Sequence, residues 1–222
     1  MEKRIYVHRR RETIDDAAFA SGYRAAHETL VADTGARCAV AIALADQSPM
    51  ERVGLRPRPL LWHGVSSRWG DVASSSRATA QLDEVVEAAS GWRVEERVAW
   101  EDDVAPDPSA PGVKSVSFVV KPGELSVEEF RRHYREHAEI ARDHHGCWKY
   151  VQNVVLAPVT LPPGKVIHAV SELWFRSLDD FVEHFYRHGA ASVEAVRKDT
   201  ADFVDFASST SMLVSEMMLS PG

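Results

Sequence analysis

Leu125-Ser-Val-Glu-Glu-Phe130 is the second copy of an earlier pattern, Ile14-Asp-Asp-Ala-Ala-Phe19, at an offset of 111 residues. Each copy begins with an aliphatic residue, continues through polar or acidic positions and ends in Phe. Four residues after each Phe comes a tyrosine, at Tyr23 and Tyr134. Internal similarity at a fixed offset indicates a duplicated fold, so this repeat guides the interpretation of the whole chain.

The similarity extends to both sides of these stretches. Upstream, residues 3–8 fall on residues 114–119 at the same offset. Downstream, Leu61-Trp62 resembles Leu173-Trp174 at an offset of 112, an alignment that requires gaps. The repeat is therefore degenerate, and the sequence predicts two halves that have diverged.

A linker separates the predicted halves. Val104-Ala-Pro-Asp-Pro-Ser-Ala-Pro-Gly112 has three prolines and a glycine among small residues, a composition typical of a connection between domains. We therefore predict a first half at residues 1–103, a linker at 104–112 and a second half at 113–222.

The second half has the pattern βαββαβ. Ser126 and Glu129 have the capping-box spacing of a helix start, and Gly146 is a typical residue at the end of a helix. The predicted elements are a strand at 115–120, a helix at 126–146, strands at 148–156 and 166–175 around a loop at 158–164, a helix at 177–196 and a strand at 211–219. The first half can be interpreted in the same way, with strands at 5–9, 37–44, 60–65 and 92–100 and helices at 15–34 and 67–89.

This element order is the ferredoxin-like, or split βαβ, motif. Each sheet then has helices on one face and a bare apolar face on the other, and two such sheets can bury their bare faces against each other. The predicted fold is α+β, with two ferredoxin-like halves packed as an intramolecular pseudo-dimeric α+β barrel.

The second half resembles the EthD family of dimeric α+β-barrel proteins. The residues that carry the resemblance are Lys121-Pro-Gly123, Leu125–Phe130, Tyr134-Arg-Glu-His137, Tyr150-Val-Gln-Asn153, Glu172-Leu-Trp-Phe175 and Asp202-Phe-Val-Asp205. The resemblance implies a small-molecule pocket between helices and sheet in each half. Related barrels include cofactor-free isomerases, cyclases, dehydratases and quinone-forming oxygenases, and some bind haem.

Composition limits the class of partner. The 222 residues include 26 basic and 33 acidic side chains, and the net charge of −7 argues against non-specific nucleic-acid binding. The longest apolar run, Ala39–Ala45, is far shorter than the roughly 18–20 residues of a membrane span. Cys38 and Cys147 form no CxxC pair, which favours packed thiols in a reducing compartment. We expect a cytoplasmic protein, monomeric or homodimeric, without membrane or nucleic-acid partners.

Two residues of the helix at 126–146 are the leading catalytic candidates. His137 lies on its apolar stripe and matches the helix histidine of the family, and an imidazole can act as general acid or base near neutral pH. Tyr134, one turn earlier, could donate a hydrogen bond to a carbonyl or a developing enolate. The alternatives are a buried histidine bonded to backbone and a tyrosine that only fills the core.

The predicted third strand supplies two further catalytic candidates, His168 and Glu172. They share one strand face with Val170 and Trp174, and a face that mixes polar and large aromatic side chains suits a pocket wall. Burial of Glu172 would raise its proton affinity and make it an acid or base partner. The alternative for Glu172 is a pair with an arginine or with backbone amides.

Six residues are candidate substrate contacts. In the second half we predict that aromatic side chains line an apolar pocket, and in the first half a second, equivalent pocket with a supporting role is possible. The candidates are Phe130, Tyr150, Trp174, Tyr23, His27 and His8. The alternative for His8 and His27 is a purely structural role.

Metal and cofactor motifs are weak. His133 and His137, like His184 and His188, have the i, i+4 spacing of metal ligands, but no carboxylate triad, CxxC or HExxH completes a site. Dinucleotide, P-loop and nucleophile-elbow motifs do not occur either. We therefore predict neither metal nor cofactor.

These residues together predict a cofactor-independent enzyme that moves a proton on an aromatic or polyketide-like carbonyl compound, in an isomerisation, cyclisation or dehydration. Two alternatives stay open. One is a cofactor-free or haem-dependent monooxygenase of the same barrel class, and the other is a non-catalytic protein that binds a hydrophobic metabolite.

Overall fold

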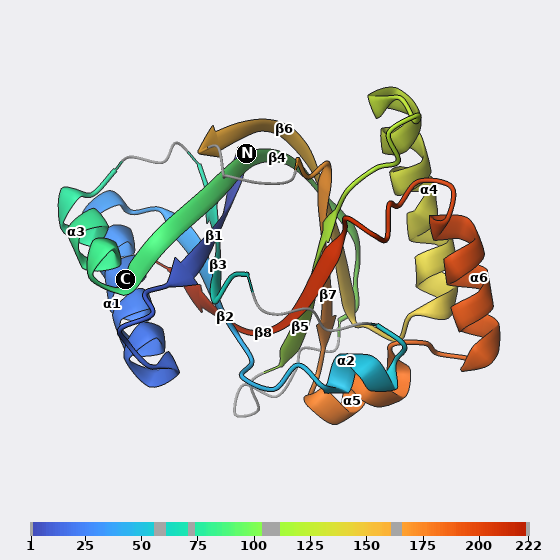
Figure 1. Ribbon diagram of the computed structural model, residues 1–222, viewed down its shortest axis with the longest axis horizontal. Coiled ribbons are helices and arrows are strands. Elements are labelled where there is room, and N and C mark those ends of the chain that lie inside the picture. Colours follow the sequence, from blue (N-terminus) through green and yellow to red (C-terminus); the bar gives the residue numbers. More distant parts are fainter. Residues whose placement is uncertain (1, 56–60, 71–73, 104–111, 161–165, 221–222) are drawn as a thin grey trace.

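Eight strands form one closed barrel with helices on its outside (Figure 1). The structure, a computed structural model, describes residues 2–55, 61–70, 74–103, 112–160 and 166–220. The strands are β1 Lys3–Arg10, β2 Arg37–Ala43, β3 Gly64–Trp69, β4 Val86–Glu101, β5 Val113–Val119, β6 Lys149–Thr160, β7 Ala169–Phe175 and β8 Thr210–Leu219. The helices are α1 Asp16–Thr34, α2 Pro49–Arg52, α3 Ser76–Val85, α4 Val127–His144, α5 Leu178–His184 and α6 Ala190–Thr200.

The strand order repeats in the two halves of the chain. Around the barrel it runs β4-β1-β3-β2 and then β8-β5-β7-β6, so each set of four has the same internal order. The sets join along both edges, β2 with β8 and β4 with β6, and all pairs are antiparallel. The predicted α+β barrel is confirmed. The bare sheet faces meet inside one closed barrel and not as two separate layers.

The helices cover the outer surface of the barrel in two groups. In Figure 1, α1 and α3 lie on the left, beside the first set of strands, and α4 and α6 lie on the right, beside the second. Asp15 caps α1 by accepting from the backbone of Ala18. Ser126 and Glu129 form the predicted capping box of α4.

Two predicted elements differ from the structure. The expected helix at 177–196 is divided into α5 and α6, because Gly189 takes a left-handed φ of 56° that interrupts it. The expected strand at 60–65 is shifted to Gly64–Trp69, and the expected helix at 67–89 is reduced to α3. Most of the predicted linker, residues 104–111, and residues 161–164 of the predicted loop lie outside the described residues.

The inner face of the barrel is an apolar core with charged residues toward one end. The core contains Ile5, Val7, Val65, Trp92, Val94, Val116, Phe118, Val170, Met212 and Val214. Pairing of β1 with β3 places Lys3 opposite Trp69, and pairing of β5 with β7 places Lys114 opposite Trp174. Trp69 is therefore the counterpart of Trp174, and the alignment of Leu61-Trp62 with Leu173-Trp174 is wrong.

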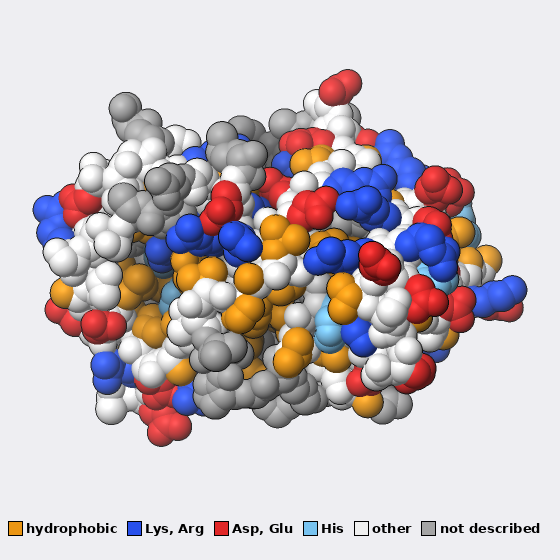
Figure 2. Space-filling model, turned by 90° about the horizontal axis from the view of Figure 1, so that it is seen from above, with side chains coloured by type: hydrophobic (Ala, Val, Ile, Leu, Met, Phe, Trp, Pro, Cys, Tyr) orange, Lys and Arg blue, Asp and Glu red, His pale blue; other side chains and the backbone are white. Residues whose placement is uncertain are grey.

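The described surface carries an apolar patch. Figure 2 shows apolar side chains gathered in the middle of one face, with acidic and basic ones around them. The exposed apolar side chains of the chain include Val98 of β4 and Leu156 and Val159 of β6. A patch of this kind is compatible with the predicted monomer or homodimer. Among the described residues, no helix combines the length and apolar character needed to cross a membrane.

Candidate functional site

Strand β7 divides the predicted site residues between two sides of the sheet. Val170 belongs to the core inside the barrel, whereas Leu173 packs with Ala138 and Ala141 of α4 on the outside. Because side chains alternate along a strand, Glu172 and Trp174 face the interior, as Val170 does. The helix residues His137 and Tyr134 lie on the outside. The structure therefore does not bring the predicted residues into one pocket.

Glu172 is held inside the barrel by two lysines. Its two carboxylate oxygens accept from Lys3 Nζ and Lys114 Nζ, each at 2.8 Å, and Asn153 Nδ2 donates at 2.9 Å. Burial alone raises the pKa of Glu172, but the two ammonium groups outweigh it and lower the pKa below its usual value. The expected rise in proton affinity is wrong. Glu172 is therefore ionised and pairs with two lysines, not with an arginine or backbone amides as in the alternative, and its predicted catalytic role stays untested.

Trp174 belongs to the same interior network. Its Nε1 donates to Glu216 at 2.9 Å, and Lys114 Nζ lies 5.0 Å from the ring centroid. The first half repeats this arrangement: Trp69 Nε1 donates to Glu96 at 2.8 Å, and Lys3 Nζ lies 5.0 Å from the Trp69 ring. A contact that recurs in both halves at equivalent positions indicates that Trp174 supports the barrel.

His137 forms a pair with a residue that the sequence analysis missed. Its Nδ1 lies 2.6 Å from Oδ2 of Asp199, which α6 places beside α4. A carboxylate only accepts, so in the neutral imidazole Nδ1 carries the proton and Nε2 keeps the lone pair. The His137 side chain is 10% exposed and that of Asp199 31%, so the pair lies at the edge of the helix layer.

Aromatic rings surround this pair. The Phe203 centroid lies 5.5 Å from that of His137, and the Tyr150 ring is nearly perpendicular to the imidazole at 6.4 Å. Tyr134 Oη lies 2.8 Å from Ser171 Oγ. Burial raises the pKa of Tyr150 to about 12 and that of Tyr134 well above its usual value, so both phenols stay protonated and able to donate.

Phe130 and His168 lie farther along the same layer, so the prediction that His168 shares a face with Val170 and Trp174 is wrong. Phe130 stacks on Tyr134 with centroids 5.6 Å apart, and its ring is 5.7 Å from that of His168. The Nδ1 atom of His168 accepts from the backbone of Lys121 at 3.2 Å. Burial, and then the nearby Lys121 charge, lower the pKa of His168. His168 therefore binds backbone in this structure, and the catalytic role predicted for it stays untested.

In the first half, the three predicted residues do come together. Tyr23 Oη lies 2.8 Å from His8 Nδ1, and His27 Nδ1 donates to the backbone carbonyl of Tyr23 at 2.8 Å. Gly64 makes room for them, because a Cβ there would lie 2.7 Å from the Tyr23 ring. Burial lowers the pKa of His27 to about 3 and that of His8 well below its usual value. Both imidazoles are therefore neutral, and His27 Nε2 is buried without a partner among the described residues.

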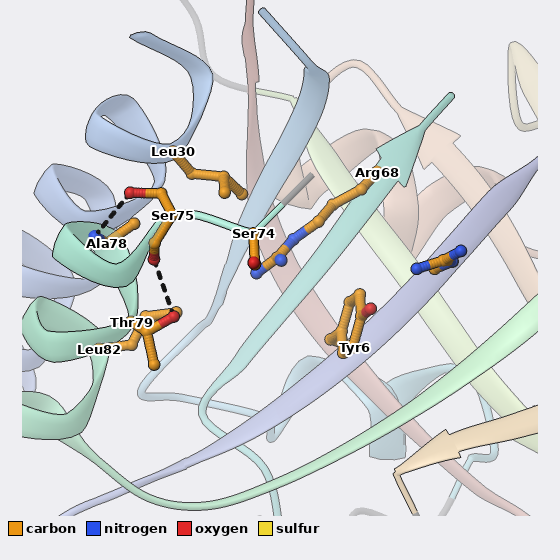
Figure 3. A pocket seen from close by; sticks show the side chains of 9 residues that line it. Tyr6, Leu30, Arg68, Ser74, Ser75, Ala78, Thr79 and Leu82 are labelled. Carbon is orange, nitrogen blue, oxygen red and sulfur yellow. Dashed lines mark hydrogen bonds between the residues drawn. The ribbon is translucent and has the colours of Figure 1, made fainter. Parts of the chain in front are cut away.

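A cavity of about 190 Å³ lies in the same layer, between the outer face of β1 and β3 and the helices α1 and α3 (Figure 3). Figure 3 shows Arg68 extending from β3 toward Ser74, with Tyr6 of β1 nearby. The lining residues are Arg4, Tyr6, Leu30, Arg68, Ser74, Ser75, Ala78, Thr79 and Leu82. Sequence analysis did not single out the two arginines, because their importance becomes visible only once the strand register is known.

The histidines that have the i, i+4 spacing of metal ligands contact other side chains in the structure. His184 Nδ1 lies 2.9 Å from Asp180, and His133 lies beside Arg132. The described part of the chain contains no group of three or more His, Cys, Asp or Glu side chains that could hold a metal ion. Cys38 and Cys147 are buried and form no disulfide.

Comparison with known proteins finds a family match within the second half. Residues 122–207 match the family model described as "EthD domain". Similar solved structures include a "putative monooxygenase" from Fusobacterium nucleatum (TM-score 0.61, 9% identity, covering 100% of this chain and 94% of that one). A second, from Lactobacillus acidophilus and also described as a "putative monooxygenase", has a TM-score of 0.55 and 9% identity, with 100% and 96% covered.

A third similar structure is an anthrone oxidase-like protein, with a TM-score of 0.56, 10% identity and coverage of 100% and 93%. At these identities the likeness concerns the fold, and all three cover the whole barrel. No curated protein matches the chain.

Proposed function

We propose that this chain, whose residues 122–207 form an EthD domain, is an enzyme that moves a proton on a small aromatic or polyketide-like carbonyl compound. The general base is His137. The observation that carries the proposal is the 2.6 Å contact between His137 Nδ1 and Asp199 Oδ2. A carboxylate behind an imidazole fixes the tautomer and stabilises the imidazolium that forms when Nε2 takes a proton.

The proposed reaction begins at a carbon next to a carbonyl group. His137 Nε2 removes a proton from that carbon, and the electron pair of the broken C–H bond forms an enolate. The imidazolium then returns the proton to a different atom of the substrate, which completes an isomerisation or prepares a ring closure or dehydration. The phenol of Tyr134, kept protonated by burial, is the group placed one turn away to donate to the enolate oxygen.

The surroundings of His137 favour an aromatic substrate. Phe203 and Tyr150 pack against the imidazole and Tyr134 packs against Phe203, and aromatic pairs prefer offset or edge-to-face contact. Beside the predicted Tyr150, Phe203 takes the place of Trp174, since Trp174 faces the barrel interior.

We also propose that the chain arose by duplication of one smaller fold. We infer two ferredoxin-like halves, at about 1–103 and 113–222, joined by a linker at 104–112. The repeated strand order and the matching Lys3–Trp69–Glu96 and Lys114–Trp174–Glu216 groups support this division. In this scheme the second half keeps the proton-transfer chemistry.

A cofactor-free oxygenase is the second candidate, favoured by the names of the similar structures. Its first step is also removal of a C–H proton by His137 Nε2, here from a carbon that is conjugated with the carbonyl through the aromatic rings. With anthrone, loss of the proton at the carbon opposite the carbonyl gives an enolate that reduces O2, and the balanced outcome is one anthraquinone and one water for each anthrone and O2 consumed.

Oxygen uptake separates these candidates. Anthrone is mixed with the purified protein in air-saturated buffer, and O2 consumption and anthraquinone formation are recorded against buffer alone. One O2 per anthraquinone identifies an oxygenase. Catalysed proton exchange without O2 uptake identifies the proton-transfer enzyme. Binding of anthrone without either reaction contradicts the enzyme proposal and identifies a carrier.

A further inference from the structure

We propose that the cavity of the first half is a binding site for a small organic acid, a carboxylate carried on an apolar body the size of one aromatic ring. This site lies beside α1 and α3, on the opposite side of the barrel from α4, the helix that carries His137 (Figure 1), and is independent of the proposed proton transfer.

The main support for this site is Arg68, a positively charged side chain that forms no ion pair with any described residue. Its guanidinium extends into the cavity (Figure 3), stacks over the Tyr6 ring at 4.6 Å, and leaves Nε buried without a hydrogen-bond partner. No carboxylate in the described parts of the chain forms an ion pair with it. A guanidinium is a rigid fork of donors that matches a carboxylate, and leaving the buried Nε donor of Arg68 unpaired is unfavourable. An anionic ligand would accept a hydrogen bond from it.

The remaining walls select an organic anion over a bare ion. Arg4 adds a second guanidinium at the rim, where Glu2 pairs with it at 2.8 Å. Leu30, Ala78 and Leu82 supply an apolar wall from α1 and α3. Thr79 Oγ1 already donates to the Ser75 carbonyl at 2.9 Å, so the hydroxyls are partly occupied. The ligand that fits best therefore has a carboxylate that faces the arginines and a hydrocarbon body that faces the helices.

The second half provides an internal comparison. Arg4 pairs with Arg68 across β1 and β3, and the equivalent pair across β5 and β7 is Ser115 with Leu173. Leu173 packs into the apolar cluster beneath α4. The same barrel position is thus stable with a hydroxyl and an aliphatic side chain, so the two arginines are not required to build the fold.

The size of the cavity limits the ligand. Its volume of about 190 Å³ is below the roughly 300–1,000 Å³ of sites for drug-sized molecules. Benzoate, with one ring and one carboxylate, is therefore the probe.

Calorimetric titration with benzoate tests the site, with neutral benzamide and inorganic phosphate as comparison ligands at constant ionic strength. The wild-type protein is expected to bind benzoate saturably and benzamide at least about tenfold more weakly, since charge-assisted bonds are lost. Arg68→Leu, which installs the residue of the other half, should weaken benzoate binding at least about tenfold. Arg77→Leu removes the same charge from α3, outside the cavity, where Arg77 pairs with Asp33, and should change binding by less than about twofold.

A variant that fills the cavity provides a second test if Arg68→Leu does not fold. Leu82→Trp leaves both arginines in place and should abolish benzoate binding. The proposal is overturned if wild-type protein does not bind benzoate, if phosphate binds as tightly as benzoate, or if Arg68→Leu and Arg77→Leu weaken binding equally.

Discussion

Lys3 Nζ lies 2.8 Å from Glu172 Oε2, although 169 residues separate the two in sequence. Lys114, the counterpart of Lys3, reaches the other oxygen of the same carboxylate. The position equivalent to Glu172 in the first half is Ser67, opposite Ile5 as Glu172 is opposite Val116. One carboxylate therefore ties two equivalent lysines together and breaks the symmetry of the barrel interior.

Removing this charge should destabilise the whole barrel. Glu172→Gln leaves two buried ammonium groups short of one negative partner, and breaking a buried charge network by one member costs about 3 kcal/mol or more. Urea denaturation measures the free energy of unfolding. Glu95→Gln, which breaks the exposed pair with Arg135, is the control and should cost less than about 1 kcal/mol. Equal, small losses in both variants would show that Glu172 does not join the halves.

Acid should destabilise the protein through its buried neutral histidines. Burial lowers the pKa of His27 to about 3 and that of His145 to about 4. Below about pH 6.5 the unfolded chain binds protons at these residues while the folded chain does not. The contribution of these histidines to the free energy of unfolding is therefore fully present above about pH 6.5. It decreases as the pH falls toward 4, by up to about 1.4 kcal/mol per pH unit for each histidine.

The variant His27→Gln checks this assignment. Denaturation is measured at about pH 7 and about pH 5. Between these values the unfolding free energy of the variant should change less than that of wild type, because the unfolded variant takes up about one proton fewer. Identical slopes in wild type and variant would mean that His27 does not contribute to acid sensitivity.

The pairing of His137 with Asp199 should matter for rate and not for folding. Asp199→Asn keeps a group of the same shape but removes the charge that stabilises an imidazolium, and turnover of the anthrone probe should fall at least about tenfold. Glu194→Gln removes an equal charge from an exposed position of α6 and should leave turnover within about twofold. Steady-state kinetics of both variants, with their circular dichroism spectra, provide the measurement. Equal turnover in the two variants would rule out a role for Asp199.

The fold could be predicted from the sequence because each copy of the repeat, and each helix cap, is a short local pattern of residues. The offset of 111 residues aligned Lys3 with Lys114 correctly, and Ser126 with Glu129 marked the start of α4. The downstream register failed at Trp69, since the chain between the helices differs in length between the halves. Alternation along a strand showed which residues share a face, but not whether that face meets helices or the barrel interior.

The site could be predicted only in part. His137 followed from helical periodicity, whereas Asp199 lay beyond the end of the single helix expected at 177–196, and the break at Gly189 is a backbone property. Glu172 was found, but its two lysine partners come from β1 and β5, and pairing over such distances leaves no local pattern in sequence. The arginines of the cavity needed the same long-range register.

Deuterium exchange into anthrone without oxygen tests the central claim most directly. In D2O buffer under nitrogen, wild-type protein should accelerate exchange at the acidic carbon of anthrone over buffer alone, as followed by proton NMR. His137→Gln should reduce the catalysed rate about a hundredfold or more, the lower end for general acid–base catalysis, while its unfolding midpoint stays close to that of wild type. Exchange at the wild-type rate in His137→Gln would contradict the assignment of His137 as the base.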